Sequence, residues 1–208
     1  MFSTNSKIYH ILTNFTDVLY LGVLWTLFSI PIVTIGASTT ALYYVSTKKA
    51  SNRDGTSVFR DFWDSFRSNF MKSTAAFLIL TAITLILLYN FEFLYLNSEE
   101  SSVMLFILNI LTILFAIQTL FIFLTIFPII ARFDLSLKSA FITALILSNK
   151  HLLLTIGNVV VFLGLLYFSF VLPILIFFFM GIYAYIASFS LLQIFRKNNE
   201  SFDEYLSE

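Results

Sequence analysis

The side chains that could act as acids, bases, nucleophiles or metal ligands are few and widely spaced in this sequence. Cysteine is absent from the 208 residues, which excludes disulfides, thiolate metal sites and thiol nucleophiles. The two histidines, His10 and His151, lie at the edges of separate apolar segments, and a zinc site would need further ligands beside them. No G-x-S-x-G motif and no glycine-rich phosphate loop is present. These features predict a protein that is not an enzyme, holds no metal or cofactor, and binds no nucleotide.

The composition is that of a membrane protein. Hydrophobic residues make up 59% of the chain and charged residues 12%, against roughly 45–50% and 25% in ordinary soluble domains. A fold surrounded by water could not cover so much phenylalanine, leucine and isoleucine with so few charges, so lipid is the expected solvent. Because 12 Lys and Arg balance 12 Asp and Glu, no nucleic-acid partner is expected. We predict a single all-α integral membrane domain over residues 1–208, in contact with membrane lipid.

Four uncharged runs are long enough to cross the hydrocarbon core, which takes about 20 residues of helix. They are residues 18–47, 73–91, 101–131 and 152–195. The last run is too long for one crossing and contains Pro173 near its middle, which predicts two helices joined by a tight turn. The simplest count is therefore about five transmembrane helices in a polytopic bundle.

Basic connections alternate with non-basic ones along the chain. Residues 48–72, residues 132–151 and the tail from Arg196 carry lysine and arginine, whereas residues 97–102 and the turn at Pro173 carry none. The positive-inside rule then places the C-terminus and both basic connections in the cytoplasm.

The side of the N-terminus depends on how the first run folds. Five crossings place it outside. A six-crossing alternative runs one helix from about residue 8 to residue 30 and returns through residues 31–47. That alternative puts Asp17 inside the hydrocarbon, at a cost of about 2.5–3.5 kcal/mol unless the carboxylate is paired, so five crossings are favoured.

The first run contains helix-breaking and small polar residues near its middle. Pro31 removes a backbone donor and disfavours helical geometry at the residue before it, and Gly36 permits backbone that other residues resist. Ser38 is suited to cap a new helix. These residues predict a broken helix near Pro31–Gly36, with helical parts at 18–30 and 39–49.

The broken helix has two interpretations. Irregular backbone at membrane depth is tolerated only where protein or water satisfies the freed groups. A kink packed against neighbouring helices meets that condition, and so does a solute path at a discontinuous helix. We favour the kink; the candidate residues for either role are Pro31, Thr34, Gly36, Ser38 and Thr39.

Two segments of the basic connections are predicted to form interfacial helices on the cytoplasmic side. Residues 58–72 place aromatic side chains on one helical face and charged side chains on the other, which is typical of a helix lying in the membrane interface. Residues 131–151 are a weaker candidate. The candidate lipid or partner surface consists of Arg60, Trp63, Arg67, Asn69, Lys72, Arg132 and Lys138.

The two interfacial segments raise the possibility of an internal repeat. Ser68-Asn69 is followed by Lys72 and then by an apolar span. Ser148-Asn149 is followed by Lys150-His151 and then by another apolar span. Residues 57–131 and 132–196 are therefore candidate parallel repeats.

Three stretches of the sequence resemble one protein family. They are "IPIVTIGASTTALYYV" (30–45), "FRDFWDSFRSNFMK" (59–72) and "FPIIARFD" (127–134). They are similar to the YesL family of bacterial integral membrane proteins, formerly a domain of unknown function numbered 624. The resemblance implies a small multi-pass protein of the bacterial plasma membrane, often encoded beside carbohydrate ABC transporters and polysaccharide-degrading enzymes. It supplies no catalytic residues.

Two functions are compatible with these features. The first is a non-enzymatic accessory partner of a bacterial carbohydrate uptake system, in contact with the permease subunits of a sugar ABC transporter. The alternative is a facilitative carrier or channel for a neutral small solute, with the broken helix lining the path.

Overall fold

The protein is described by a computed structural model, which covers residues 7–51, 57–97 and 103–205. These residues form helices and contain no strand, so the all-α prediction is confirmed for this part of the chain. The helices are α1 (Lys7–Phe28), α2 (Ile35–Ala50), α3 (Val58–Leu96), α4 (Val103–Arg132), α5 (Leu137–Lys150), α6 (Leu152–Val171) and α7 (Phe179–Tyr205), with 3₁₀ turns η1 (Ile32–Thr34) and η2 (Pro173–Phe177). The acidic connection at residues 98–102 lies outside the described residues.

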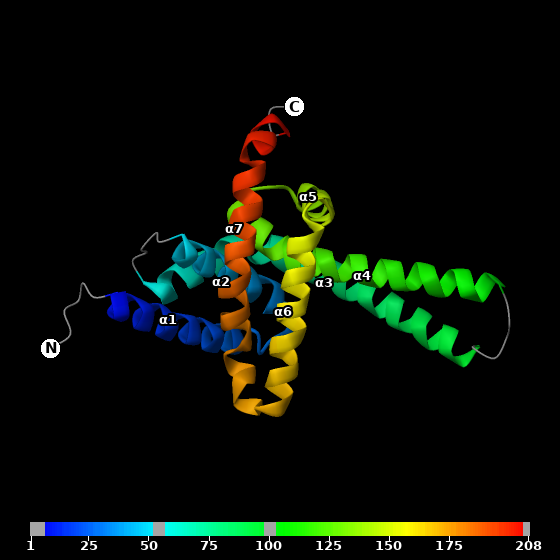
Figure 1. The fold of residues 1–208 in the computed structure, drawn as a ribbon, viewed down its shortest axis with the longest axis horizontal. Helices are drawn as coiled ribbons and strands as arrows, with labels where there is room; N and C mark the ends of the chain where they lie inside the picture. The colour runs from blue at the N-terminus through cyan, green and yellow to red at the C-terminus, as the bar shows by residue number, and fades with distance from the viewer. Residues whose placement is uncertain (1–6, 52–56, 98–102, 206–208) are drawn as a thin grey trace.

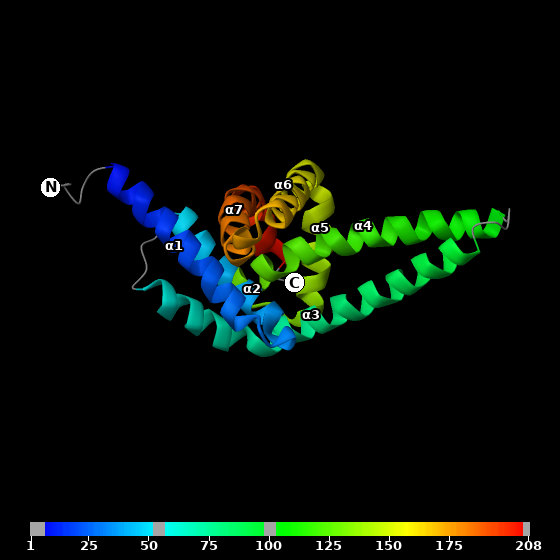
Figure 2. The ribbon, with the colours of Figure 1, turned by 90° about the horizontal axis from the view of Figure 1, so that it is seen from below.

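Among the described residues, three helices, α3, α4 and α6, are long and apolar enough to cross a membrane. Two shorter apolar stretches, Leu12–Phe28 and Phe179–Phe195, lie in α1 and α7. The chain is thus a helical membrane protein, while the count of five spans stays a prediction. In Figures 1 and 2, α6 and α7 run across the direction of the α3–α4 hairpin. In this arrangement the two helix pairs cannot both follow the membrane normal.

The first apolar run folds as a helical hairpin. Helix α1 begins at Lys7, well before the expected start at residue 18, and α2 runs back alongside it (Figure 2). Asp17 of α1 forms an ion pair with Lys49 of α2. These bounds match the two helices of the six-crossing alternative, and the ion pair supplies the partner that Asp17 was expected to need.

The helix break is confirmed at Pro31, but it is shorter than predicted. The second helix begins at Ile35 rather than Thr39, so Gly36 and Ser38 lie inside α2. The expectation that Ser38 caps this helix is wrong, because its hydroxyl donates to the Thr34 carbonyl one turn earlier at 3.0 Å. A serine hydroxyl can satisfy a carbonyl within a helix as well as it can satisfy a free N–H at a helix start.

The predicted interfacial helix at 58–72 is continuous with the following span. Helix α3 runs unbroken over 39 residues, which contain no glycine or proline that would end it. Its aromatic face is divided: Phe59 and Trp63 are exposed, as contact with lipid requires, but the middle of the face is covered by protein. Phe62 and Phe66 are buried, and their rings lie 5.4 Å and 5.2 Å from the ring of Phe28 at the end of α1.

The second predicted interfacial segment forms a separate short helix, α5. It begins after Ser136, whose side chain accepts a hydrogen bond from the Ser139 N–H at 3.2 Å, and it ends before His151. Its cytoplasmic placement stays a prediction.

The two Ser-Asn pairs make matching local hydrogen bonds. Ser68 and Asn69 both donate to the Ser65 carbonyl, at 3.2 Å and 3.1 Å, and Ser148 and Asn149 both donate to the Leu145 carbonyl, at 3.1 Å and 2.7 Å. The helix continues past the first pair and ends just after the second. The parallel repeats at 57–131 and 132–196 therefore stay a prediction.

The far halves of α3 and α4 form an arm that extends away from the other helices (Figures 1 and 2). Apolar side chains along this arm are exposed, including Ile86 at 61% and Phe115 at 63%. Exposed apolar surface of this extent marks contact with lipid or with another membrane protein. The buried core lies at the other end, where α2 contacts α1, α3, α4 and α7.

Candidate functional site

Helix α2 carries most of the candidate solute-path residues, and two of its hydroxyl groups bond to neighbouring helices. The indole Nε1 of Trp25 on α1 donates to Thr39 Oγ1 at 3.0 Å. Thr40 and Ser73 of α3 share a hydrogen bond of 2.7 Å between their hydroxyl oxygens. Both bonds join helices, which is the usual role of such groups in membrane proteins.

Gly36 lies at the closest approach of α2 and α3. A Cβ atom added there would lie 2.3 Å from the Ser73 carbonyl oxygen and 2.8 Å from Phe77 Cβ. Only glycine lets the two backbones approach this closely. Gly36 is therefore a packing residue.

The five candidate path residues do not surround a common space. Gly36, Ser38 and Thr39 are buried in helix contacts, and Pro31 is exposed at the turn. The Thr34 hydroxyl donates to the carbonyls of Phe28 and Pro31, each at 2.6 Å, which satisfies backbone freed by the break. This arrangement agrees with the interpretation of the segment as a packed kink.

A cavity of about 500 Å³ lies beside the break, lined mainly by residues that the sequence analysis did not single out. The lining residues come from the end of α1, the break, the start of α2, the end of α6, η2 and the start of α7: Trp25, Thr26, Ser29, Ile30, Ile35, Leu166, Ser169, Phe170, Ile176 and Phe179. It is mostly apolar, and the buried Ser29 hydroxyl has no hydrogen-bond partner among the described residues. The only sign of this cavity in the sequence was that two turns, at Pro31 and Pro173, carry no charge. The fold brings these two turns close together, which the sequence alone does not show.

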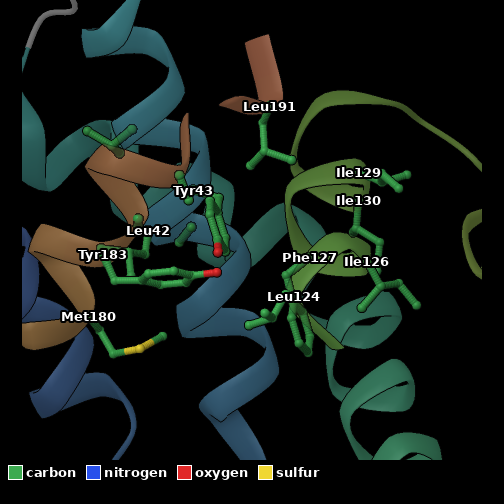
Figure 3. Close-up of a cluster of buried hydrophobic side chains, with 14 of the residues drawn as sticks. Leu42, Tyr43, Leu124, Ile126, Phe127, Ile129, Ile130, Met180, Tyr183 and Leu191 are labelled. Atoms are coloured by element: carbon green, nitrogen blue, oxygen red, sulfur yellow. The ribbon is translucent and has the colours of Figure 1, made fainter. Parts of the chain in front are cut away.

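Two buried tyrosines meet at the centre of the core. Figure 3 shows the hydroxyl groups of Tyr43 on α2 and Tyr183 on α7 pointing toward one another. Their ring centroids are 6.5 Å apart, and both side chains are almost completely buried. Tyr183 therefore belongs to the contact between α2 and α7 and is not among the residues that line the cavity beside the break.

Ion pairs connect the helices at the ends that the sequence predicts to be cytoplasmic. Lys48 Nζ of α2 lies 2.8 Å from Asp61 Oδ2 of α3. Lys72 of α3 pairs with Asp134 in the link after α4. The hydrogen bond from Lys72, and then its charge, lower the pKa of the Asp134 carboxyl.

Of the seven residues of the candidate lipid or partner surface, some are held in contacts within the protein and others are exposed. Lys72 is used in its ion pair, Asn69 bonds to its own helix, and Trp63 stacks on Phe66 with ring centroids 5.8 Å apart. The exposed side chains among the seven are those of Arg60, Trp63, Arg67, Arg132 and Lys138.

Among the described residues, no group of three or more His, Cys, Asp or Glu side chains could hold a metal ion. No curated protein and no solved structure matches this chain. Residues 18–91 match the model of a family described as a protein of unknown function, DUF624. YesL is the later name of that family, so the resemblance to the YesL family is confirmed over this region. The region spans most of α1, all of α2 and most of α3.

Proposed function

We propose that this protein is a non-enzymatic accessory partner of a bacterial carbohydrate uptake system, bound to the membrane subunits of an ABC transporter. The observation that supports this role is the α3–α4 arm, which presents exposed apolar side chains away from the core. An arm of this kind offers a long lateral surface to the helices of another membrane protein. The carbohydrate system and the bacterial plasma membrane are inferred from the family resemblance. The cytoplasmic C-terminus is inferred from the alternation of basic and non-basic connections.

The polar groups of the broken helix support the same choice. Thr39, Thr40 and Gly36 are all engaged in contacts between helices of this chain. Transported solutes need polar groups that are free to bind and release them. An accessory role requires no such groups and is therefore the simpler account.

Affinity capture from native membranes tests this proposal. The tagged protein, solubilised in mild detergent, is expected to recover a sugar-permease subunit. A variant of the arm, Leu114→Ala with Phe115→Ala, should recover several-fold less, because both side chains are exposed there and each buries apolar area in an interface. The control is Leu153→Ala, which removes from α6 a leucine that is even more exposed than Leu114, 85% against 57%. Reproducible recovery of no membrane partner, or equal loss with Leu153→Ala, would count against the accessory role.

The cavity beside the break favours the alternative, a facilitative carrier or channel for a neutral solute. Ile30 lines this cavity and its side chain is 72% exposed, so Ile30→Trp should fill the cavity without disturbing the core. Under the carrier hypothesis, vesicles containing the wild-type protein conduct a neutral sugar and Ile30→Trp abolishes the flux. Vesicles that stay impermeable support the accessory role.

A further inference from the structure

The cavity beside the break is lined by side chains that other parts of the fold hold in place. The indole of Trp25 is fixed by its hydrogen bond to Thr39, at 3.0 Å. The ring of Phe179 packs against that of Phe162 on α6, with ring centroids 5.6 Å apart. The cavity is therefore formed before any ligand binds, and the accessory function assigns no role to it.

The helices beside the cavity cannot move together to close it. A Cβ atom added to Gly22 of α1 would lie 2.8 Å from the Phe177 carbonyl oxygen, and one added to Gly181 of α7 would lie 2.7 Å from the Gly22 nitrogen. Backbones in contact at this distance cannot approach further. The volume of about 500 Å³ lies within the range of about 300–1,000 Å³ that is usual for preformed ligand sites.

The lining gives a ligand very few hydrogen-bond partners. The Thr26 hydroxyl donates to two backbone carbonyls, at 3.0 Å and 3.4 Å, and the Ser169 hydroxyl donates to one at 2.9 Å. The Ser29 hydroxyl has no partner among the described residues. A sugar has several hydroxyl groups, and each of them costs free energy when it is buried without a partner. The lining therefore favours an apolar ligand.

Some of the side chains that line the cavity also lie on the outer surface, and they are apolar. Ile30 is 72% exposed, Phe170 79% and Ile176 56%. The two turns that carry these residues belong to the uncharged runs at 18–47 and 152–195. In a membrane protein, surface of this kind faces lipid. A ligand that enters the cavity past these side chains therefore comes from the lipid.

Hydrocarbon is the material that fills such a cavity best. Atoms that line an empty space lose dispersion contacts, and apolar cavities stay free of water and take up apolar molecules. A lipid chain restores the contacts and gives up no hydrogen bond on entering.

The charge of the lining narrows the choice of lipid. A free fatty acid would bring a carboxylate, and the described lining residues include no lysine or arginine to pair with it. We propose that the cavity beside the break holds one acyl chain of a membrane phospholipid. The proposal does not depend on the accessory function, and a cavity filled in this way has no space for the neutral solute of the alternative function.

Quenching of Trp25 fluorescence by a brominated phospholipid tests the proposal, because bromine quenches an indole only at close range. The chain has two tryptophans, so all measurements use a Trp63→Phe parent protein in which Trp25 is the only one left. The parent is washed in detergent to remove surface lipid, and dibromostearoyl phosphatidylcholine is added to the micelles in rising amounts. Quenching should saturate, as expected for a single bound lipid.

Two variants place a larger side chain at the cavity. Ile30→Phe and Ile176→Phe both change exposed lining residues, so they should fold as the parent does and reduce the saturable quenching several-fold. The matched control is Ile32→Phe, because Ile32 is 71% exposed and is not among the lining residues. Ile32→Phe should be quenched as the parent is.

Three results overturn the proposal. The first is quenching that rises in proportion to the amount of lipid without saturating, and the second is equal quenching in the parent and both cavity variants. The third is a loss in Ile32→Phe as large as that in Ile30→Phe, which indicates lipid on the outer surface alone. Quenching by dibromostearic acid as strong as that by the phospholipid overturns the phospholipid assignment and identifies a site for free fatty acid.

Discussion

Replacing Gly36 by alanine tests whether the break exists to bring α2 against α3. The added Cβ would lie 2.3 Å from the Ser73 carbonyl oxygen, where an ordinary contact is 3.4–4 Å, so the two helices must separate by about 1 Å. The obstructing atom belongs to the backbone of a helix, which cannot rotate away as a flexible side chain could. Overpacking of this kind costs about 1–3 kcal/mol, and the backbone obstacle places Gly36→Ala near the upper end of that range.

The assay is thermal unfolding in detergent micelles, followed by tryptophan fluorescence and by loss of the monodisperse elution peak. A loss of about 3 kcal/mol corresponds to a fall in Tm of about 6–12 °C for a chain of this size. Gly157→Ala is the matched control, because a Cβ at Gly157 meets no atom within 4 Å. Gly157→Ala should leave the Tm unchanged or raise it, because alanine stabilises a helix by up to about 1 kcal/mol relative to glycine.

The outcome separates the two interpretations of the broken helix. If Gly36 lined an open solute path, alanine would fit without a penalty and the Tm would match that of wild type. That result, or an equal fall for Gly157→Ala, would refute the packing argument.

Three further predictions concern the polar contacts between helices, all measured as the Tm in the same micelles. Asp17→Asn should lower stability by about 1–3 kcal/mol because it leaves the Lys49 ammonium without its partner, and adding Lys49→Gln should recover part of the loss. Thr40→Val should cost about 1 kcal/mol, the typical value of one hydrogen bond, and lower the Tm by about 2–4 °C. Pairing with Lys72 lowers the pKa of folded Asp134 below 3.8, so its stabilisation is present at neutral pH and is lost as the pH falls through that lowered value. Asp134→Asn should therefore weaken the acid-induced fall in Tm.

Each of these predictions has a result that contradicts it. The first fails if the double variant is no more stable than Asp17→Asn alone. The second fails if Thr40→Val is as stable as wild type, and the third fails if Asp134→Asn loses stability in acid as steeply as wild type does.

The sequence predicted those parts of the fold that depend on composition and on single helix-breaking residues. High hydrophobicity requires lipid, and lipid requires helices whose backbone groups are satisfied internally. Pro31 and Pro173 each end a helix because proline removes a donor and disfavours the turn before it. These effects are local, so no knowledge of distant residues was needed to place the two turns.

The wrong predictions arose where distant residues decide the outcome. The change from charged to uncharged sequence at Lys72 suggested a helix boundary, but Asp134 pairs with that lysine and α3 continues without a break. The face with Phe62 and Phe66 suggested lipid contact, and the fold covers it with Phe28. The cavity beside the break joins residues far apart in the chain, so the sequence marked only the two proline turns beside it and not the residues that line it.

The position of α2 explains why a membrane segment combines a proline, a glycine and several hydroxyls. Proline reverses the chain at the break, which returns α2 along α1 and into contact with α3, α4 and α7. A helix with neighbours on so many sides can approach them only through small side chains, and Gly36, Ala37, Ser38 and Ala41 are all buried. Close approach excludes water, and two of the hydroxyls bond across the contacts: Thr39 accepts from Trp25 of α1, and Thr40 shares a hydrogen bond with Ser73 of α3. A solute path would need these hydroxyls free, whereas here they join α2 to the helices on either side of it.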